Sequence, residues 1–365
     1  MTHILYVLPY LGQGGTEKQA LSLIQALGDR YDLSLLAPDG PGAAPFRALS
    51  IPQATFTRWD FNFFKGFFEV LRALRAMHRQ KKIDLVHIHG AHELMIPCRW
   101  VLRHTPMIFT VHGYHGSGAL FSYRTSAWLS QWLAQGVITV CQAEDDLLRR
   151  FGLAGPKRHL IYNGVPQPKL EPEKTRAWAQ TLHLQPDQQL IIGTAARLNP
   201  VKGLTYLIQA FAQLSGEHLR LVIAGTGDLE ADLKQEADDL GVGDRTIFTG
   251  YVADLANLMQ VFDIFVLPSL EEACSLACAE AMAQGKPIVG TNVGGIPEQV
   301  ADKINGFIVP PQDATALAEK LGQLVADPEL RHRFGQNSGD RYRDNFSLAT
   351  MVAQTTQLYD QFIQP

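Results

Sequence analysis

The chain has 365 residues, of which 46% are hydrophobic and 19% charged, and 32 Lys and Arg against 36 Asp and Glu give a net charge of −4. These values indicate a globular protein of about two domains and disfavour a dedicated nucleic-acid binder. Four scattered cysteines are too few for a disulfide framework, which favours a reduced, cytoplasmic location. Without an apolar run of membrane-spanning length or a signal-peptide pattern at Met1, we expect neither membrane insertion nor secretion.

Short apolar runs rich in β-branched residues alternate with helical patterns along the chain. The runs are continuous, which is typical of parallel strands buried on both faces. Between them, as at residues 17–27 and 203–214, apolar residues recur at three- and four-residue spacing. This alternation predicts an α/β fold with doubly wound parallel sheets. The predicted strands are residues 3–9, 33–37, 85–89, 107–112, 137–141, 190–195, 219–224, 246–249, 264–268, 287–290 and 306–309.

A break in this alternation divides the chain. Residues 162–168, continuing to Lys174 with another proline, lose the periodicity, and a second alternating set begins near Leu190. We therefore predict domains at 1–165 and 166–345, facing each other across a cleft into which the carboxyl ends of the strands point. The first 165 residues carry 17 Lys and Arg against 11 Asp and Glu, and the other 200 carry 15 against 25. The basic first domain favours an anionic partner on that side, although chance surface composition gives the same pattern.

Candidate binding residues follow the predicted strands. Gly14 and Gly15 follow the first strand and precede a helix, a position that suits either a plain tight turn or a contact with phosphate. Arg197 and Lys202 follow the strand at 190–195, where two cations suit a diphosphate, although solvated surface charges would look the same.

Two carboxylates lie farther along the second domain. Glu272 stands in a loop after the strand at 264–268, and Glu280 follows eight residues later on an apolar helix. The small residues between them leave helix N-terminal amides free for a phosphate, while a carboxylate beyond can accept hydrogen bonds from a ribose diol. Glu280 as a merely satisfied buried acid is the structural alternative.

An ordered set of motifs resembles one family. The set is Gly14-Gly15-Thr16-Glu17, Val111-His112-Gly113, Tyr162-Asn163-Gly164-Val165, Arg197 with Lys202-Gly203, Ala224-Gly225-Thr226-Gly227, Glu272 with Glu280-Ala-Met-Ala, residues 287–298, and residues 306–310. Together they resemble the retaining glycosyltransferases of family 4 (glycosyl transferases group 1), which have the GT-B fold of two facing Rossmann-like domains.

The resemblance implies a role for each matching residue. Arg197 and Lys202 would clamp the diphosphate of a nucleotide-sugar donor, Glu280 would hold the ribose, and Glu272 would hold hydroxyls of the transferred sugar. Amides near Ser275 and Leu276 would meet the distal phosphate, the base would rest near Tyr251 and Val252, and Gly225 would be a further donor-binding residue. His112 would line the cleft opposite the anomeric carbon, Gly14 and Gly15 would lie near the phosphates and acceptor, and residues 346–365 would form a helix packed back on the first domain.

Two further features have competing interpretations. His87-x-His89-x-x-His92 suggests a metal, but strand alternation should separate these side chains, so we expect no metal site. Residues 58–82 hold seven Lys and Arg, two acidic residues and six aromatic residues, with Phe63, Phe67, Val70 and Leu74 on one helical face. Such a segment suits either an anionic membrane interface or a core-facing helix with a basic outer side.

These observations predict a cytoplasmic, retaining glycosyltransferase that uses a UDP- or GDP-sugar and no tightly bound cofactor. The acceptor would be a glycan or a lipid-linked molecule, with peripheral association at the inner membrane face if the basic segment meets lipid. A nucleotide-sugar epimerase of the same architecture and a non-catalytic sugar-nucleotide-binding subunit are the alternatives.

Overall fold

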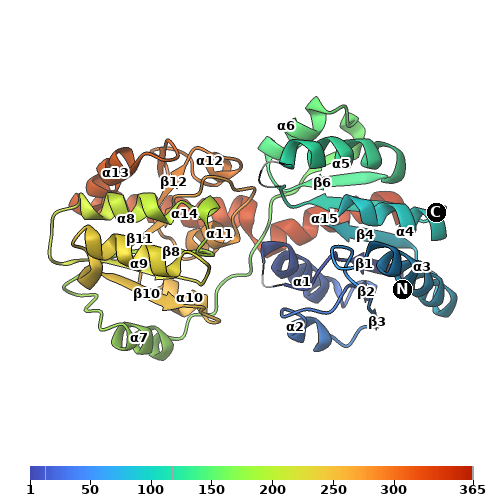
Figure 1. The fold of residues 1–365 in the computed structure, drawn as a ribbon, viewed down its shortest axis with the longest axis horizontal. Helices are drawn as coiled ribbons and strands as arrows, with labels where there is room; N and C mark the ends of the chain where they lie inside the picture. The colour runs from blue at the N-terminus through green and yellow to red at the C-terminus, as the bar shows by residue number, and fades with distance from the viewer. Residues whose placement is uncertain (13, 115, 117, 364–365) are drawn as a thin grey trace. The chain divides into compact units, whose positions relative to one another are not determined.

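The computed structural model describes residues 1–12, 14–114, 116 and 118–363, and it divides into two compact units (Figure 1). The first unit comprises Met1–Gly164 together with the segment that starts at Leu348, and the second comprises Val165–Ser347. The chain therefore passes between the units twice, at Gly164–Val165 and again at Ser347–Leu348.

The first unit is built on a seven-stranded parallel sheet with the order β3-β2-β1-β4-β5-β6-β7. Ile4 of the central strand pairs with Leu33 on one side and Leu85 on the other. The strand order reverses between β1 and β4, and ligands of doubly wound sheets bind at such a switch point. The strands are β1 (His3–Val7), β2 (Asp32–Leu36), β3 (Gln53–Ala54), β4 (Leu85–His89), β5 (Met107–Val111), β6 (Gly136–Thr139) and β7 (Arg158–Leu160).

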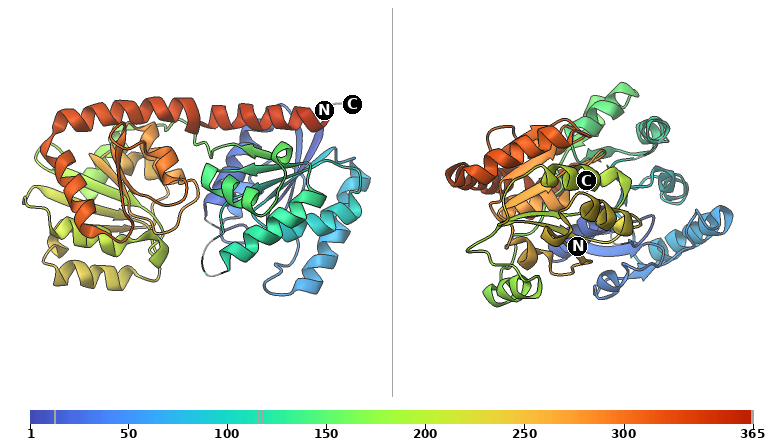
Figure 2. Two further views of the ribbon diagram at one scale, coloured as in Figure 1. Left: turned by 90° about the horizontal axis from the view of Figure 1, so that it is seen from above. Right: turned by 60° about the vertical axis from the view of Figure 1, so that its left-hand side comes forward.

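Helices cover both faces of this sheet (Figure 2). Ile4 and Tyr6 face one core with α1 (Gly15–Leu27), α2 (Ala44–Arg47) and α15 (Leu348–Ile363), and Tyr359 of α15 is fully buried in it. Leu5 and Val7, which alternate with them, face a second core. That core is formed with α3 (Phe63–Gln80), η1 (His92–Leu94), α4 (Met95–Val101), α5 (Ala119–Leu133) and α6 (Gln142–Arg150), while η2 (Gly155–Lys157) precedes β7.

The second unit contains a six-stranded parallel sheet with the order β10-β9-β8-β11-β12-β13. Its switch point lies between β8 and β11, where Ile264 pairs with Ile192. The strands are β8 (Leu190–Ala195), β9 (Leu219–Ala224), β10 (Thr246–Gly250), β11 (Ile264–Leu267), β12 (Ile288–Thr291) and β13 (Gly306–Val309).

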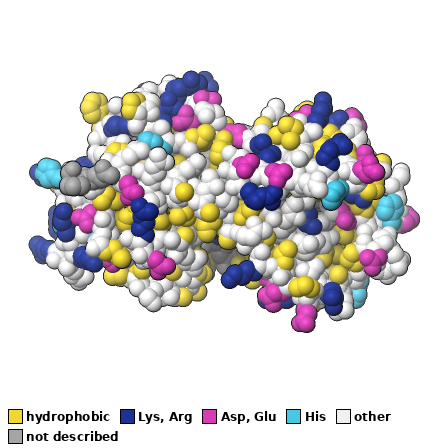
Figure 3. All heavy atoms as spheres, turned by 180° about the vertical axis from the view of Figure 1, so that it is seen from behind, with side chains coloured by type: hydrophobic (Ala, Val, Ile, Leu, Met, Phe, Trp, Pro, Cys, Tyr) yellow, Lys and Arg dark blue, Asp and Glu magenta, His cyan; other side chains and the backbone are white. Residues whose placement is uncertain are grey.

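Helices also lie on both faces of the second sheet (Figure 2). Leu207 and Phe211 of α8 pack with Leu321 of α13 in one core, and α11 contacts α14 on the other face. The helical elements are α7 (Pro172–Thr181), η3 (Pro200–Lys202), α8 (Leu204–Ala212), α9 (Glu230–Asp239), η4 (Gly243–Arg245), α10 (Leu255–Met259), α11 (Leu276–Ala283), α12 (Ile296–Gln299), α13 (Ala314–Ala326), α14 (Pro328–Arg341) and the π-turn η5 (Tyr342–Phe346). Seen from the side of α15, both units show acidic and basic side chains interspersed (Figure 3).

The predicted α/β fold with parallel sheets is confirmed, and each of the eleven predicted strands is present within about two residues of its expected bounds. β3 and β7, the short strands at the two edges of the first sheet, were not predicted. The predicted linker was too long at its far end, because Pro172 begins α7. Proline is favoured at a first helical position, where its missing N–H costs no hydrogen bond.

Candidate active site

In the second unit, the candidate residues lie in loops and a helix that follow the carboxyl ends of the strands. These ends meet at one edge of a parallel sheet, so the loops that follow them are neighbours. Arg197 and Lys202 follow β8, Gly225 follows β9, Tyr251 and Val252 follow β10, and Glu272, Ser275, Leu276 and Glu280 follow β11.

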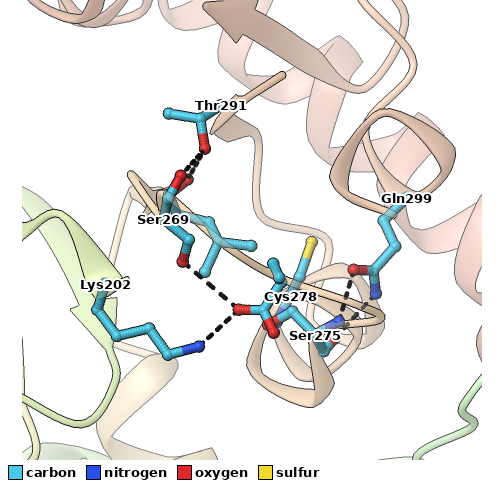
Figure 4. A network of polar contacts seen from close by, with 8 residues as sticks. Lys202, Ser269, Ser275, Cys278, Thr291 and Gln299 are labelled. Atoms are coloured by element: carbon cyan, nitrogen blue, oxygen red, sulfur yellow. Dashed lines mark hydrogen bonds and ion pairs between the residues drawn. The ribbon is translucent and has the colours of Figure 1, made fainter. Parts of the chain in front are cut away.

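An ion pair joins two of these loops. Lys202 Nζ lies 2.7 Å from Glu272 Oε2, and the two side chains are only 16% and 12% exposed (Figure 4). Ser269 Oγ donates a longer bond of 3.4 Å to the same carboxylate oxygen, and Thr291 Oγ1 donates to the Ser269 carbonyl at 2.5 Å. A cation and a carboxylate are thus held side by side, where one suits phosphate oxygens and the other suits sugar hydroxyls.

Two glycines allow the chain to approach closely around this pair. Gly203 has a φ of +61°, and a Cβ there would lie 2.1 Å from the carbonyl oxygen of Pro268. Gly294 has a φ of +49°, and a Cβ there would lie 1.6 Å from the carbonyl oxygen of Glu272. Because only glycine fits these positions, both loops that carry the ion pair depend on a glycine for their packing.

Gln299 fixes the start of α11. Its Nε2 donates to the Ser275 carbonyl and its Oε1 accepts from the Ser275 amide, both at 2.9 Å, and Gln299 is fully buried. Ser275 Oγ caps the helix by accepting from the Cys278 amide at 3.2 Å. The Ser275 amide therefore already has a partner in Gln299, and the amides of Leu276 and Ala277 follow it in the first turn of α11. The phosphate contact near Ser275 and Leu276 stays a prediction.

The other residues that are predicted to bind the donor lie at the same edge of the second sheet. Arg197 is exposed, and within the described part of the chain no carboxylate forms an ion pair with it. The Gly225 amide donates to the Gly250 carbonyl at 2.8 Å, which places the Gly225 turn beside Tyr251. Tyr251 is 60% exposed, Val252 is half-buried, and Glu280 is half-buried on α11.

In the first unit, Gly14 and Gly15 form the N-terminus of α1. The buried Glu17 accepts from the Gly12 amide at 2.6 Å, and a Cβ at Gly12 or Gly14 would lie within 3.0 Å of its carboxylate oxygens. The Glu17 carboxylate therefore packs against the glycine turn and holds the Gly12 amide, a role that was not predicted from the sequence. Gln13, which directly precedes Gly14 in the sequence, is outside the described residues.

His112 follows β5 and belongs to a buried chain of rings. Its Nε2 lies 3.0 Å from His89 Nδ1, and the two rings stack with centroids 5.3 Å apart. The fully buried His87 bonds Tyr359 of α15 at 2.5 Å and Thr110 at 2.7 Å. Burial lowers the pKa of His87 and of His112 to about 3, and it lowers the pKa of His89 well below its ordinary value. All three rings are therefore neutral near pH 7.

The expected separation of the three histidines by strand alternation was wrong. His87 and His89 are two residues apart, so they share a face of the sheet, and their ring centroids lie 4.1 Å apart. His92 points elsewhere and hydrogen-bonds Tyr114 and Thr125 at 3.0 Å each. Among the residues that the structure describes, no group of His, Cys, Asp or Glu is arranged to hold a metal ion.

Two doubly wound parallel-sheet units, with candidate residues at the carboxyl ends of their strands, define a GT-B glycosyltransferase architecture. The crystal structure of HepE from Anabaena in complex with UDP-glucose matches with a TM-score of 0.86 at 22% identity, over 99% of this chain and 100% of that chain. WaaG, a glycosyltransferase involved in lipopolysaccharide biosynthesis, matches with a TM-score of 0.74 at 15% identity, over 98% and 99% of the two chains.

Sequence comparison identifies the family. Residues 13–167 match the model of Glycosyltransferase Family 4, and residues 180–341 match that of Glycosyl transferases group 1. The Bacillus subtilis protein EpsD, named as a glycosyltransferase, is 31% identical over 315 residues, which are 80% of this chain and 81% of EpsD. The chain belongs to the family 4 glycosyltransferases, as the resemblance of its motifs predicted.

Proposed function

We propose that this protein is a retaining glycosyltransferase that transfers a sugar from a UDP- or GDP-sugar to a glycan or lipid-linked acceptor. The observation that carries the proposal is the shielded pair of Lys202 and Glu272, held 2.7 Å apart beside the N-terminus of α11. A diphospho-sugar has anionic oxygens next to a ring of hydroxyls, so it matches a cation and a carboxylate placed side by side.

Each donor-side group has a part in the proposed reaction. Lys202, the exposed Arg197 and the first free amides of α11 stabilise the negative charge that develops on the leaving diphosphate. Glu272 accepts hydrogen bonds from the transferred sugar, and Glu280 accepts them from the ribose. Tyr251 and Val252, beside the Gly225 turn, receive the base. His112, Gly14 and Gly15 serve the acceptor side.

The proposed transfer retains the anomeric configuration through front-face attack. The bond between the anomeric carbon and the diphosphate oxygen breaks while the acceptor oxygen bonds to the same face of that carbon. The acceptor proton passes to the leaving phosphate oxygen, so atoms and charge balance without a covalent sugar–enzyme intermediate. The protein then acts mainly through fixed charges and amides.

The names of similar proteins support a role in building surface glycans. HepE was crystallised with UDP-glucose, and WaaG is described as involved in lipopolysaccharide biosynthesis. We propose a cytoplasmic role in the synthesis of a cell-surface polysaccharide or glycolipid, where nucleotide sugars are the donors and no tightly bound cofactor is required.

Thermal-shift screening against UDP-, GDP- and ADP-sugars tests the donor class. A true donor raises the melting temperature because it binds only the folded state. The shift should be lost in Lys202→Ala and kept in Lys234→Ala, whose lysine pairs with Glu230 at the same 2.7 Å distance on the exposed surface of α9. Consumption of the donor without transfer would favour an epimerase, and binding without turnover would favour a non-catalytic subunit.

A further inference from the structure

Large aromatic side chains project into solvent from three helices of the first unit. Phe64 and Phe68 lie on α3, Trp100 on α4, and Phe121, Trp128 and Trp132 on α5. Their exposed fractions run from 58% to 74%. We call these six residues the aromatic face. The predicted amphipathic segment included its α3 part, whereas the α4 and α5 residues emerge only from the structure.

The three helices are neighbours. α3 contacts α4, α4 contacts α5, and the rings of Phe67 and Trp100 bridge the first two helices with centroids 6.0 Å apart. The inner sides of the same helices contribute Leu74, Cys98 and Ala127 to the core. The interpretation of the segment at residues 58–82 as a core-facing helix is therefore right for Leu74. The aromatic face is the outer side of the three helices, whose inner sides are packed in the core.

Basic residues are interleaved with these aromatic side chains. α3, α4 and α5 together hold six Lys and Arg against the single acid Glu69. Arg72 follows Phe68 by one helical turn, and Arg124 lies between Phe121 and Trp128, both with exposed side chains. The face thus combines apolar rings with positive charge.

We propose that the aromatic face docks the first unit onto an anionic lipid bilayer. Tryptophan and phenylalanine suit the boundary between headgroups and acyl chains, and interleaved arginines suit anionic headgroups. A second copy of the chain is disfavoured as the occupant, because a two-fold contact would place the arginines of one face against those of the other.

The contact would be peripheral. Within the described residues, none of the helices has both the length and the hydropathy that crossing a bilayer requires. Aromatic rings on the outside of packed helices can enter only the interfacial layer, because the same helices carry their inner residues in the protein core.

The aromatic face lies on helices that adjoin the proposed acceptor side of the first unit. α4 and α5 each begin after the carboxyl end of a strand, at the edge that also carries Gly14 and His112. Phe121 lies in the first turn of α5, so docking through this residue would bring that edge close to the membrane surface. If the proposed transfer is correct, on which this step rests, the acceptor is one that is anchored in the bilayer.

Vesicle sedimentation with the full chain tests the docking. We expect binding to equimolar phosphatidylcholine–phosphatidylglycerol vesicles, little binding to phosphatidylcholine alone, and weaker binding as salt is raised. Trp128→Ser/Trp132→Ser should lower binding by about tenfold or more, because it removes the two largest apolar groups on α5. The matched control is Leu240→Ser/Ile304→Ser, which removes two exposed apolar side chains of the second unit and should bind as the wild type does.

Folding and vesicle binding are measured separately. Circular-dichroism melting shows whether the serine variant folds, and Arg72→Glu/Arg124→Glu, which changes exposed charges only, provides a second route to the same loss. Equal binding to both vesicle types, or undiminished binding by both variants, would overturn the proposal. So would a wild-type dimer that Trp128→Ser/Trp132→Ser converts to a monomer. Because no donor or acceptor is present, these outcomes do not depend on the proposed transfer.

Discussion

The two units share an architecture but differ in surface and buried chemistry. The first carries 17 Lys and Arg against 12 Asp and Glu, and the second carries 15 against 24. Among the described residues, nine exposed large aromatic side chains belong to the first unit and only Tyr251 belongs to the second. The same sheet topology thus supports an aromatic, basic exterior in one unit and a shielded ion pair in the other.

The buried polar groups differ in the same way. In the first unit, neutral histidine and tyrosine rings contact one another from Tyr6 and Tyr359 to His112, through hydrogen bonds and, between His87 and His89, through ring packing. In the second, Lys202 and Glu272 form a shielded ion pair. Charged groups suit a diphosphate donor, whereas neutral rings orient one another without the cost of burying a charge.

Removing the lysine of the donor site should have the largest effect. Lys202→Ala should lower kcat/KM, for transfer or for donor hydrolysis, by about a hundredfold or more, comparable to the loss of one transition-state donor. Arg197→Ala should act in the same direction. Lys234→Ala is the matched control, since its equally short ion pair lies on the exposed surface of α9. Near-wild-type rates in Lys202→Ala would remove this residue from the mechanism.

The histidine chain should make stability depend on pH. The pKa of His87 is lowered to about 3 in the folded state, while in the unfolded chain it returns to its ordinary value of about 6.5. Unfolding therefore takes up a proton between these values, and stability present above pH 6.5 is lost as the pH falls.

Between pH 7 and pH 5, His87 should account for about 2 kcal/mol of lost stability. Urea unfolding at both pH values, in wild type and in His87→Gln, measures this contribution, because glutamine does not titrate. The variant is less stable at both pH values but should lose less between them. Identical losses in the two proteins would show that His87 does not titrate as described.

The aromatic face should contribute least to stability. Phe64→Ser and Trp128→Ser should each change the free energy of unfolding by no more than about 0.5 kcal/mol, because both side chains are mostly exposed. Leu74→Ala, on the inner side of α3, should cost about 2–5 kcal/mol. Chemical denaturation compares the three variants. A large loss in Trp128→Ser would mean that its ring is part of the core.

The sequence predicted the fold better than the contacts within the site. Long apolar runs indicate buried parallel strands. β3 has only two residues and β7 has the sequence Arg-His-Leu, so neither contains an apolar run. Lys202 and Glu272 are 70 residues apart, and their contact depends on neighbouring strand ends that periodicity does not define. The contacts of Gln299 with Ser275 and of His89 with His112 were missed for the same reason, since each forms only through the tertiary fold.

Proton NMR of the product tests the central claim most directly. Purified enzyme is given an α-linked nucleotide sugar that binds in the thermal-shift screen, and the first-formed product is observed before its anomers interconvert. A retaining glycosyltransferase of the proposed mechanism predicts an α-anomeric product with a small coupling constant. A β-anomeric product from the same α-linked donor would contradict it.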